Sequence, residues 1–166
     1  MLTDLVQIRR FGEQKRAENE RFRKHLKRHA FAERRIRKFA EEVEEGIDCL
    51  TCANCCRVAT VRLSERDVAR LAKHLRIAPA VFLRDYTNES PEEGLILKLT
   101  ESGCVFLSGN QCTVYDERPG NCSDFPHTIR GSGSFVSRMW EFTDRAVYCP
   151  IVYNTLEKLK EEVGFR

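Results

Sequence analysis

The stretch Cys49-Leu-Thr-Cys52-Ala-Asn-Cys55-Cys56 places four cysteines within eight residues of the chain. The other four cysteines are spread along the rest of the sequence, at Cys104, Cys112, Cys122 and Cys149. Thiolates are soft ligands that bind zinc and iron–sulfur clusters well. Because half of the thiols are concentrated in one run, the sequence predicts a metal centre with all eight cysteines as candidate ligands.

The spacing of the first three cysteines bears on which metal is bound. In Cys49-x2-Cys52-x2-Cys55 the thiols recur at two-residue gaps, as in the ferredoxin run that surrounds one face of a four-iron cluster. Zinc ribbons instead offer two separated Cys-x2-Cys pairs. Cys149-Pro150 repeats the cysteine–proline step of the ferredoxin pattern. The pattern favours a 4Fe–4S iron–sulfur cluster, with zinc as the alternative cofactor.

Cys55 and Cys56 are adjacent, which limits what they can do together. A disulfide between neighbours would be strained, because adjacent alpha carbons lie closer than disulfide geometry prefers. We expect the two side chains to diverge, so that they do not bind one mononuclear ion together. Cys56 then either serves a second site with the downstream cysteines or is a buried thiol.

Composition supports a folded protein in a reducing compartment. The chain has 166 residues, of which 42% are hydrophobic, enough for one domain and an appendage. It has no apolar run of membrane-spanning length, and its first residues do not resemble a secretory signal. We therefore expect a cytoplasmic protein with no membrane span, in which structural disulfides are uncommon.

Charge is unevenly distributed and suggests a domain boundary. Residues 1–40 contain 13 Lys and Arg against 5 Asp and Glu, a local balance of +8, whereas the whole chain carries +3. We expect a basic helical extension over 1–45 and a cysteine-cluster metal-binding domain over 46–166. A bend near Gly12 or at 29–31 would divide the extension into two helices, and Gly46 would end it. Its buried stripe is predicted to be Phe22, Leu26, Ala30, Ile36, Phe39, Val43 and Ile47.

The basic extension has two interpretations. Clustered Arg and Lys could contact nucleic acid or an acidic protein partner. Alternatively, the basic residues lie on a solvent-exposed face of the helix and form local ion pairs with its acidic residues. These acids are Glu13, Glu18, Glu20 and Glu33. The second interpretation is favoured, since no aromatic nucleic-acid motif accompanies the charge; a nucleic-acid partner is possible but not favoured.

After residue 45 the sequence predicts short helices and short strands in alternation, which indicates an α+β fold. Ser64 should cap a helix whose buried stripe is Val68, Leu71, Ala72 and Leu75, and Pro79 should begin another. A final helix should begin at Pro150, with Ile151, Leu156 and Leu159 facing inward. The cysteine run, residues 49–56, is expected to be a loop or a knuckle. Short strands are expected at 58–63, 95–99 and 135–140, and a hairpin at 103–115.

The hairpin would bring two distant thiols together. A three-residue turn, Ser108-Gly-Asn110, places Cys112 opposite Phe106 and Val114 opposite Cys104. Because side chains alternate along a strand, both cysteines then project from one face as diagonal neighbours.

Several segments taken together resemble a known family. They are the cysteine run, Leu63-Ser64-x2-Asp67-Val68, Cys104-Val-Phe-Leu107, Cys112-Thr-Val-Tyr115-x2-Arg118-Pro119-x2-Cys122 and Phe125-Pro126. Their order and spacing resemble the YkgJ-type cysteine-cluster family from about residue 49 to Cys149. The resemblance implies a zinc- or iron-chelating domain. The family includes a flagellin lysine methylase, which the resemblance suggests carries an iron–sulfur cluster, but methylation is not carried over, because this chain has no glycine-rich cofactor loop.

The sequence therefore predicts a metal-binding cysteine-cluster protein. One alternative is a redox enzyme or electron carrier using an iron–sulfur cluster. Another is a zinc-stabilised interaction module that docks a protein partner through its basic N-terminal helix. No Ser-His-Asp arrangement, phosphate loop or pair of acid–base carboxylates can be assigned, so enzymatic activity stays an open question. Arg118, beside Pro119, is expected to offset the negative charge of the thiolates.

Overall fold

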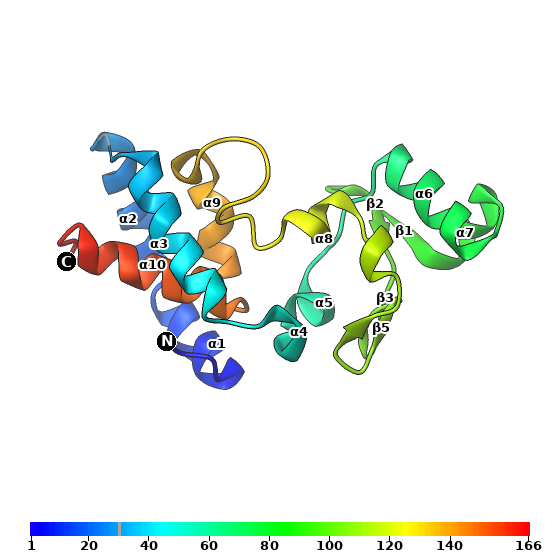
Figure 1. Cartoon of the computed structure of the whole chain (residues 1–166), viewed down its shortest axis with the longest axis horizontal. Coiled ribbons are helices and arrows are strands. Elements are labelled where there is room, and N and C mark those ends of the chain that lie inside the picture. The colour runs from blue at the N-terminus through cyan, green and yellow to red at the C-terminus, as the bar shows by residue number, and fades with distance from the viewer. Residues whose placement is uncertain (30) are drawn as a thin grey trace. The chain divides into compact units, whose positions relative to one another are not determined.

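A computed structural model describes residues 1–29 and 31–166, and its elements confirm the α+β class (Figure 1). The chain forms two compact units. The helical unit comprises residues 1–48 and 126–166, and the cysteine unit comprises residues 49–125. Residues 126–166 therefore belong to the same compact unit as the N-terminal helices. The domain boundary predicted from the sequence, between 1–45 and 46–166, stays a prediction.

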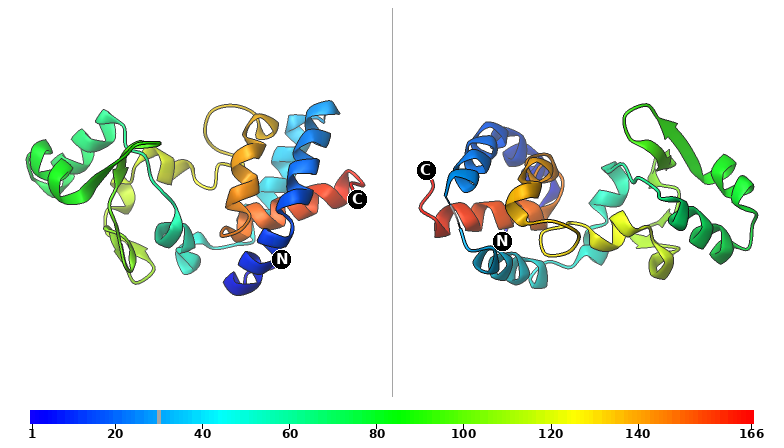
Figure 2. Two further views of the ribbon diagram at one scale, coloured as in Figure 1. Left: turned by 180° about the vertical axis from the view of Figure 1, so that it is seen from behind. Right: turned by 90° about the horizontal axis from the view of Figure 1, so that it is seen from above.

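The helical unit is built from five helices in its described residues, and both termini belong to it (Figure 1). The helix α10 runs through the unit, with α3 on one side and α1 and α2 on the other (Figure 2). The helices are α1 (Leu5–Gln14), α2 (Arg16–Arg28), α3 (Glu33–Glu45), α9 (Phe135–Arg145) and α10 (Pro150–Glu162).

The predicted N-terminal extension contains three helices. The first break falls at Lys15, not at Gly12, and the second lies in the predicted region at the end of α2. Gly46 follows α3, as expected. Of the predicted stripe, Ala30 lies outside the described residues and Phe39 is half-buried; the buried members are Phe22, Leu26, Ile36, Val43 and Ile47.

Residues 135–140, predicted as a strand, form the first half of helix α9, so that prediction is wrong. Phe135, Met139 and Phe142 recur at helical spacing and are all buried. The Ser134 hydroxyl accepts a hydrogen bond from the Ser137 amide at 3.1 Å, which caps the helix. The Glu33 carboxylate accepts another from the Phe135 amide, and this contact across the unit could not be read from local sequence.

A buried ion pair joins the C-terminal helix to α2. The Lys160 side chain is 5% exposed, and its Nζ lies 2.5 Å from Glu18 and 2.6 Å from Glu157. A buried ammonium is tolerated only when it is paired in this way. Glu18 is therefore engaged within the protein: against the effect of burial, its pKa is lowered mainly by Lys160 and to a smaller extent by the charges of Lys15 and Arg21.

The cysteine unit contains short helices and three antiparallel two-stranded pairs, β1–β2, β3–β4 and β5–β6. Its helical segments are α4 (Cys49–Cys52), α5 (Asn54–Val58), α6 (Glu65–Leu75), α7 (Pro79–Tyr86), the 3-10 turn η1 (Tyr115–Glu117) and α8 (Gly120–Asp124). Its strands are β1 (Thr87–Ser90), β2 (Gly94–Leu97), β3 (Leu99–Thr100), β4 (Gly103–Cys104), β5 (Leu107–Ser108) and β6 (Gln111–Cys112).

The core of the cysteine unit lies between α6, α7 and the strands. Val68, Leu71 and Ala72 of the predicted stripe are buried, while Leu75 is partly buried against the same cluster. Phe82, Tyr86 and Phe106 form a cluster of near-parallel rings, with centroids 5.4 Å (Phe82–Tyr86), 5.3 Å (Tyr86–Phe106) and 6.4 Å (Phe82–Phe106) apart. This aromatic stack fixes the segment that carries Cys104 against the two helices.

Two local predictions in this unit are wrong. The cysteine run is not a loop but two short helices, α4 and α5, separated by Ala53 in the left-handed conformation with φ 47°. Residues 58–63 do not form a regular strand; Arg62 makes one isolated bridge to Ile96. The strand expected at 95–99 is divided between β2 and β3.

None of the helices among the described residues has the length and apolar character needed to cross a membrane.

A substitution at Gly12 tests the packing of the helical unit. A Cβ at this position would lie 2.6 Å from the carbonyl oxygen of Ala146 and 2.7 Å from the alpha carbon of Val147. We expect Gly12→Ala to lower the free energy of unfolding by about 1–3 kcal/mol, because overpacking outweighs the gain in helix propensity. Urea unfolding measures the change. Gly120→Ala is the control, since a Cβ at that position would have nothing within 4 Å; a Gly12→Ala protein as stable as this control would contradict the expectation.

Candidate metal centre

Seven of the eight cysteines belong to the cysteine unit, and none of the eight is in a disulfide. Cys149 belongs to the helical unit, where it is 5% exposed and precedes the first turn of α10. The seven others lie on α4, α5, β4, β6 and α8. The cysteine unit thus gathers thiols from three separate parts of the chain.

The two short helices of the cysteine run set the positions of its thiols. The left-handed Ala53 lies between Cys52 on α4 and Cys55 on α5, and its amide donates to the Cys49 carbonyl at 3.1 Å. The Cys55 and Cys56 sulfurs lie 4.0 Å apart, so the expected divergence of these two side chains is not observed. Consecutive residues on a helix are only about 100° apart, whereas they point to opposite faces of a strand.

Four thiols interact electrostatically in this unit. Burial raises the pKa of Cys122 to about 12, and the thiolates of Cys104, Cys56 and Cys112 raise it further by repulsion. The same repulsion from Cys56 raises the pKa of Cys104 and of Cys112, for which burial is the larger cause. The structure therefore brings Cys56, Cys104, Cys112 and Cys122 into one neighbourhood, although they come from α5, β4, β6 and α8.

Cys56 differs from the other three thiols. A hydrogen bond with Cys55 lowers the pKa of Cys56 to about 7; Arg57 and Arg118 favour its thiolate, and burial opposes them. The group thus combines one thiol that ionises near neutral pH with three whose ionisation is suppressed. Such a set binds a soft cation well, because the cation supplies the positive charge that lets the remaining thiols lose their protons.

The hairpin that carries Cys112 has a different register from the predicted one. Leu107 pairs with Cys112 and Ser108 with Gln111, so the loop has two residues and not three. Gly109 takes a φ of 61° in this loop, a conformation that glycine adopts at little cost. Cys104 pairs with Leu99 in a separate ladder. The predicted register is wrong, yet Cys104 and Cys112 still act on each other electrostatically.

A close approach of two backbones places Cys104 near Cys56. At Gly103, which has a φ of 121°, a Cβ would lie 2.8 Å from the Cys56 carbonyl oxygen and 3.0 Å from the Arg57 alpha carbon. Both the conformation and the contact require glycine. The residue before Cys104 is therefore packed directly on the backbone that carries Cys56.

Arg57 and Asn110 join the cysteine run to the tip of the hairpin. The Arg57 guanidinium donates to the Asn110 side-chain oxygen at 2.6 Å and to the carbonyls of Gly109 and Cys52 at 3.0 Å and 3.3 Å. The Asn110 amide in turn donates to the Thr51 carbonyl at 2.9 Å. Sequence reasoning missed this role for both residues, because they lie more than fifty positions apart and match no motif.

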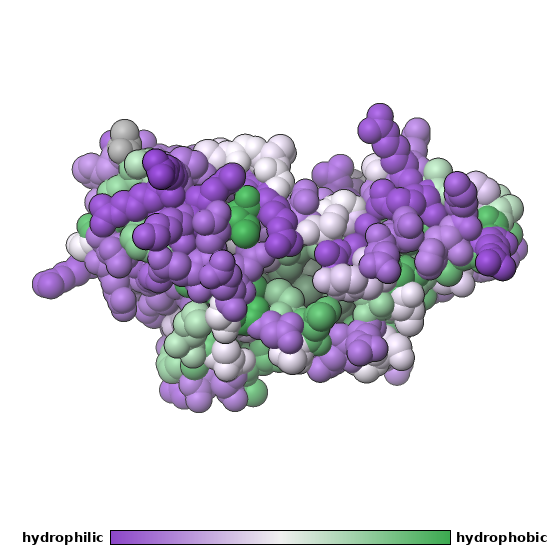
Figure 3. Space-filling model, in the orientation of Figure 1, coloured by the Kyte–Doolittle hydropathy of each residue, from purple (hydrophilic) through white to green (hydrophobic). Residues whose placement is uncertain are grey.

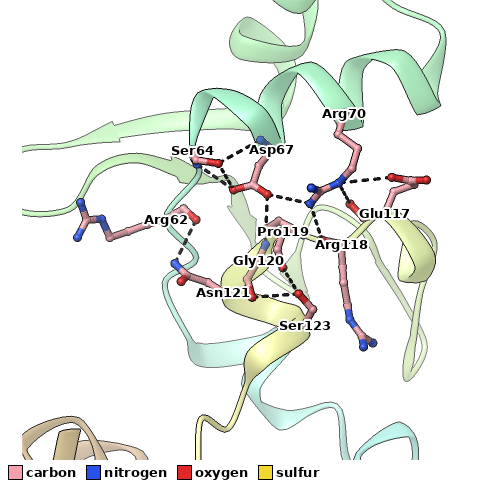
Figure 4. A network of polar contacts seen from close by, with 10 residues as sticks. All are labelled: Arg62, Ser64, Asp67, Arg70, Glu117, Arg118, Pro119, Gly120, Asn121 and Ser123. Atoms are coloured by element: carbon pink, nitrogen blue, oxygen red, sulfur yellow. Dashed lines mark hydrogen bonds and ion pairs between the residues drawn. The ribbon is translucent and has the colours of Figure 1, made fainter. Parts of the chain in front are cut away.

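Asp67 on α6 positions the turn that precedes Cys122 (Figure 4). One carboxylate oxygen accepts from the Ser64 amide at 2.9 Å and from the Ser64 hydroxyl at 2.6 Å. The other accepts from the Gly120 amide at 3.2 Å and from the Arg70 guanidinium at 2.8 Å. Since Gly120 is the first residue of α8, the carboxylate links the start of α6 to the helix that carries Cys122.

Arg70 also contributes to the link between α6 and α8, because it binds main-chain carbonyls just before Pro119. Its guanidinium donates to the carbonyl of Arg118 at 2.9 Å and to that of Glu117 at 3.4 Å. The Arg118 side chain extends away from Arg70 (Figure 4), and its guanidinium lies 3.8 Å from the centroid of the Tyr115 ring. From there its charge lowers the pKa of Cys56, Cys112 and Cys122, against the larger effects named above. The predicted proximity of Arg118 to the thiolates agrees with this placement.

The donor chemistry fits a thiolate-bound metal. Cys₄ sets hold zinc or iron–sulfur clusters, and a nearby guanidinium reduces the cost of their negative charge. Among the residues that the structure describes, no three Cys, His, Asp or Glu side chains are arranged closely enough to hold a single ion. The four thiols are thus neighbours whose thiolate charges repel one another.

The comparison with protein families shows the class of domain. The family model CxxCxxCC, described as "Putative zinc- or iron-chelating domain", matches residues 48–150, and the chain belongs to this family. The match includes all eight cysteines and also Asp67, Arg70 and Arg118. Neither a curated protein nor a solved structure matches the chain.

Asp67 gives a test of the link between α6 and α8. We expect Asp67→Asn to lower the free energy of unfolding at pH 7 by about 1–3 kcal/mol, because a buried carboxylate that accepts four hydrogen bonds is lost. Chemical denaturation with and without bound metal measures this change. Asp85→Asn is the control, since Asp85 is exposed and pairs only with its neighbour Arg84 among the contacts described.

The same variant predicts a pH dependence. Hydrogen bonds from Ser64 and Gly120 and the charge of Arg70 lower the pKa of Asp67 in the folded state, against the opposing effect of burial. A lowered folded-state pKa contributes stability above the unfolded value of 3.8, and this contribution is lost as the pH falls below it. The stability difference between wild type and Asp67→Asn should therefore be constant from pH 7 to 5 and shrink below about pH 4. A difference that grows on acidification would contradict this assignment.

Proposed function

We propose that the protein binds a metal centre through the thiolates of Cys56, Cys104, Cys112 and Cys122, and that this centre holds the cysteine unit together. The observation that carries the proposal is the convergence of four thiols from α5, β4, β6 and α8: Gly103 packs on the Cys56 backbone and Arg57 binds the hairpin tip. The electrostatic effects among these thiols agree with this convergence. In the absence of a cation their ionisation is mutually unfavourable, whereas a bound metal turns the same four groups into a cross-link between α5, β4, β6 and α8. Such a centre is primarily structural, since four protein ligands leave no open coordination position on zinc.

Cys49, Cys52 and Cys55 form a second group of candidate ligands. Their two-residue spacing supports a 4Fe–4S cluster, as in the ferredoxin run, with zinc as the alternative. The 4.0 Å separation of the Cys55 and Cys56 sulfurs makes α5 the junction between the two groups. Cys149 is retained as a proposed ligand from the sequence, and its own variant tests that proposal.

An electron-transfer role is the second candidate function. The iron–sulfur spacing supports it, because clusters fully ligated by protein thiolates exchange electrons without opening a coordination position. A reducing compartment such as the cytoplasm suits both roles, because the thiols must remain free to bind metal. Zinc would leave only the structural role, since Zn²⁺ has no redox chemistry.

The metal content of the anaerobically purified full chain tests the proposal. We expect stoichiometric metal together with protection of the thiols from alkylation, and with iron and sulfide in equal amounts if the cluster is of the 4Fe–4S type. Elemental analysis, sulfide assay and visible spectroscopy give the result. A colourless protein with stoichiometric zinc would exclude the iron–sulfur form, and a metal-free protein whose eight thiols all react would refute metal binding.

Single Cys→Ser variants distinguish the two groups of thiols. We expect Cys104→Ser, Cys112→Ser and Cys122→Ser to lose the same metal equivalent and to lower stability, because each removes one ligand of a shared centre. Cys52→Ser should affect a different equivalent if the second group is separate. Cys149→Ser tests the proposed ligand in the helical unit: full retention of metal in this variant would remove Cys149 from the set of ligands. Loss of metal in Cys52→Ser with full retention in Cys122→Ser would contradict the assignment of the first centre.

Arg118 tests the role of charge near the thiolates. Arg118→Gln should weaken metal binding about 10- to 100-fold, the usual effect of losing a residue that supports the ligands, and Arg118→Lys should recover part of that loss. Chelator competition measures the affinity. Arg62→Gln is the matched control, because Arg62 is exposed and its ion pair is with Glu93. Equal effects of Gln and Lys at position 118 would indicate that the stacking on Tyr115, and not the charge, matters.

A further inference from the structure

The outward face of α2 carries a row of exposed cations. Arg21, Lys24 and Arg28 are all exposed and recur at i, i+3 and i+7, so they lie along one face of the helix. The opposite face, with Asn19, Phe22 and Leu26, is buried in the helical unit. The three charged residues rise about 4.5 Å and then about 6 Å along the helix axis. The fold therefore fixes three neighbouring cations on a rigid support.

The acidic residues expected to pair with this helix are engaged elsewhere or with other cations. Glu13 pairs with Arg16 and Glu20 pairs with Arg23. Glu18 binds the buried Lys160, and Glu33 accepts from the Phe135 amide. Across residues 1–29 and 31–166, no ion pair joins an acidic side chain to any of the three cations of the row. Arg21, Lys24 and Arg28 thus form no ion pair among the described residues, although the charge of Arg21 still acts on the Glu18 carboxylate.

The neighbouring helix α3 provides an internal contrast. Its exposed basic residues Arg34 and Lys38 share one face with the exposed acids Glu41 and Glu45. Glu41 lies three residues after Lys38, and Glu45 lies four residues after Glu41. This is the mixed pattern of an ordinary solvated helix. The row on α2 has one sign of charge only, although both helices belong to the same unit.

The surroundings of the row indicate which polyanion it fits. The large apolar residues of the helical unit that are exposed lie on other segments: Met1, Leu5, Val6 and Trp140. The face of this unit that Figure 3 shows, on the side of α3, is mostly hydrophilic. A protein partner is usually anchored by aromatic or other apolar residues at the centre of the interface, and a membrane-surface helix inserts an apolar face. α2 offers neither, since its apolar face is already buried.

We propose that the α2 face of Arg21, Lys24 and Arg28 binds the phosphate backbone of a nucleic acid without reading its sequence. Cations spaced along one line neutralise successive phosphates and release their counterions, which requires no apolar anchor. The absence of exposed large apolar or aromatic side chains on the described residues of α2 excludes base stacking from this face. The proposal concerns the helical unit and does not depend on which metal the cysteine unit binds.

The test uses the full-length, metal-loaded protein and two labelled probes, a 20-base-pair DNA duplex and an RNA duplex of mixed sequence. Binding is measured by fluorescence anisotropy between about 50 and 200 mM salt. We compare wild type with Arg21→Gln, Lys24→Gln and Arg28→Gln combined. The matched control combines Arg34→Gln, Arg37→Gln and Lys38→Gln on α3, which removes the same net charge from the same unit. Circular dichroism and metal content confirm that both variants are folded.

Wild type should bind both probes with little dependence on their sequence. The α2 variant should bind at least about tenfold more weakly at about 100 mM salt, and its slope of log K against log salt should be smaller in magnitude by about 3. The α3 control should retain most of the affinity and slope. A preference for one probe would identify the duplex form that the face fits best.

Three results would overturn the proposal. The first is no measurable binding of either duplex at about 50 mM salt, where phosphate contacts are strongest. The second is an equal loss in the α2 and α3 variants, which would assign binding to net charge and not to the row. The third is binding of polyglutamate or phosphatidylserine vesicles in place of the duplexes, which would make the partner an acidic protein or a membrane surface.

Discussion

The carboxylate of Asp67 is the contact on which the arrangement of the cysteine unit depends. It accepts hydrogen bonds from Ser64, Arg70 and Gly120, and so it caps α6 and fixes the start of α8 at once. Arg70 adds the carbonyl of Arg118, so the turn around Pro119 is bound on both sides. A neutral side chain could not replace the Asp67 carboxylate, because its negative charge strengthens these hydrogen bonds in a buried environment. The position of Cys122 thus follows from a contact made more than fifty residues earlier in the chain.

The second constraint is the electrostatic repulsion between the thiolates when four cysteines lie close together. Gly103 lets β4 approach the backbone of Cys56, and Arg57 ties the hairpin tip to the cysteine run. These contacts bring the thiols together through the main chain and not through attraction between the thiols themselves. The resulting repulsion is relieved in part by the guanidinium of Arg118. A bound cation would relieve the rest, which makes the free energy of metal binding part of the free energy of folding in our proposal.

The sequence was most informative where one residue determines a local structure. Ser64 caps α6 through its side chain, and Pro150 begins α10, because capping and the fixed φ of proline act over one turn of helix. It was least informative where a distant contact decides the outcome. Residues 135–140 are compatible with a strand until Glu33 and the core select a helix, and the hairpin register depends on a single residue in the turn. The grouping of Cys56 with downstream thiols was foreseen as one alternative, but Arg57 and Asn110 carry no signal in the sequence, since their partners are distant carbonyls and each other.

In the helical unit, the acidic residues near α2 are used in internal contacts, and this explains why the surface of α2 remains basic. Lys160 takes up the carboxylates of Glu18 and Glu157, and Glu33 is used at the start of α9, so acids near α2 contribute to internal packing. An exposed pair with Arg21 or Lys24 would contribute less than about 1 kcal/mol, whereas breaking the buried pair of Lys160 would leave an uncompensated charge. Folding therefore favours the internal use of these acids and leaves the cations of α2 facing solvent. The contacts described above that position the four thiols come from residues 49–125, whereas this surface belongs to the helical unit.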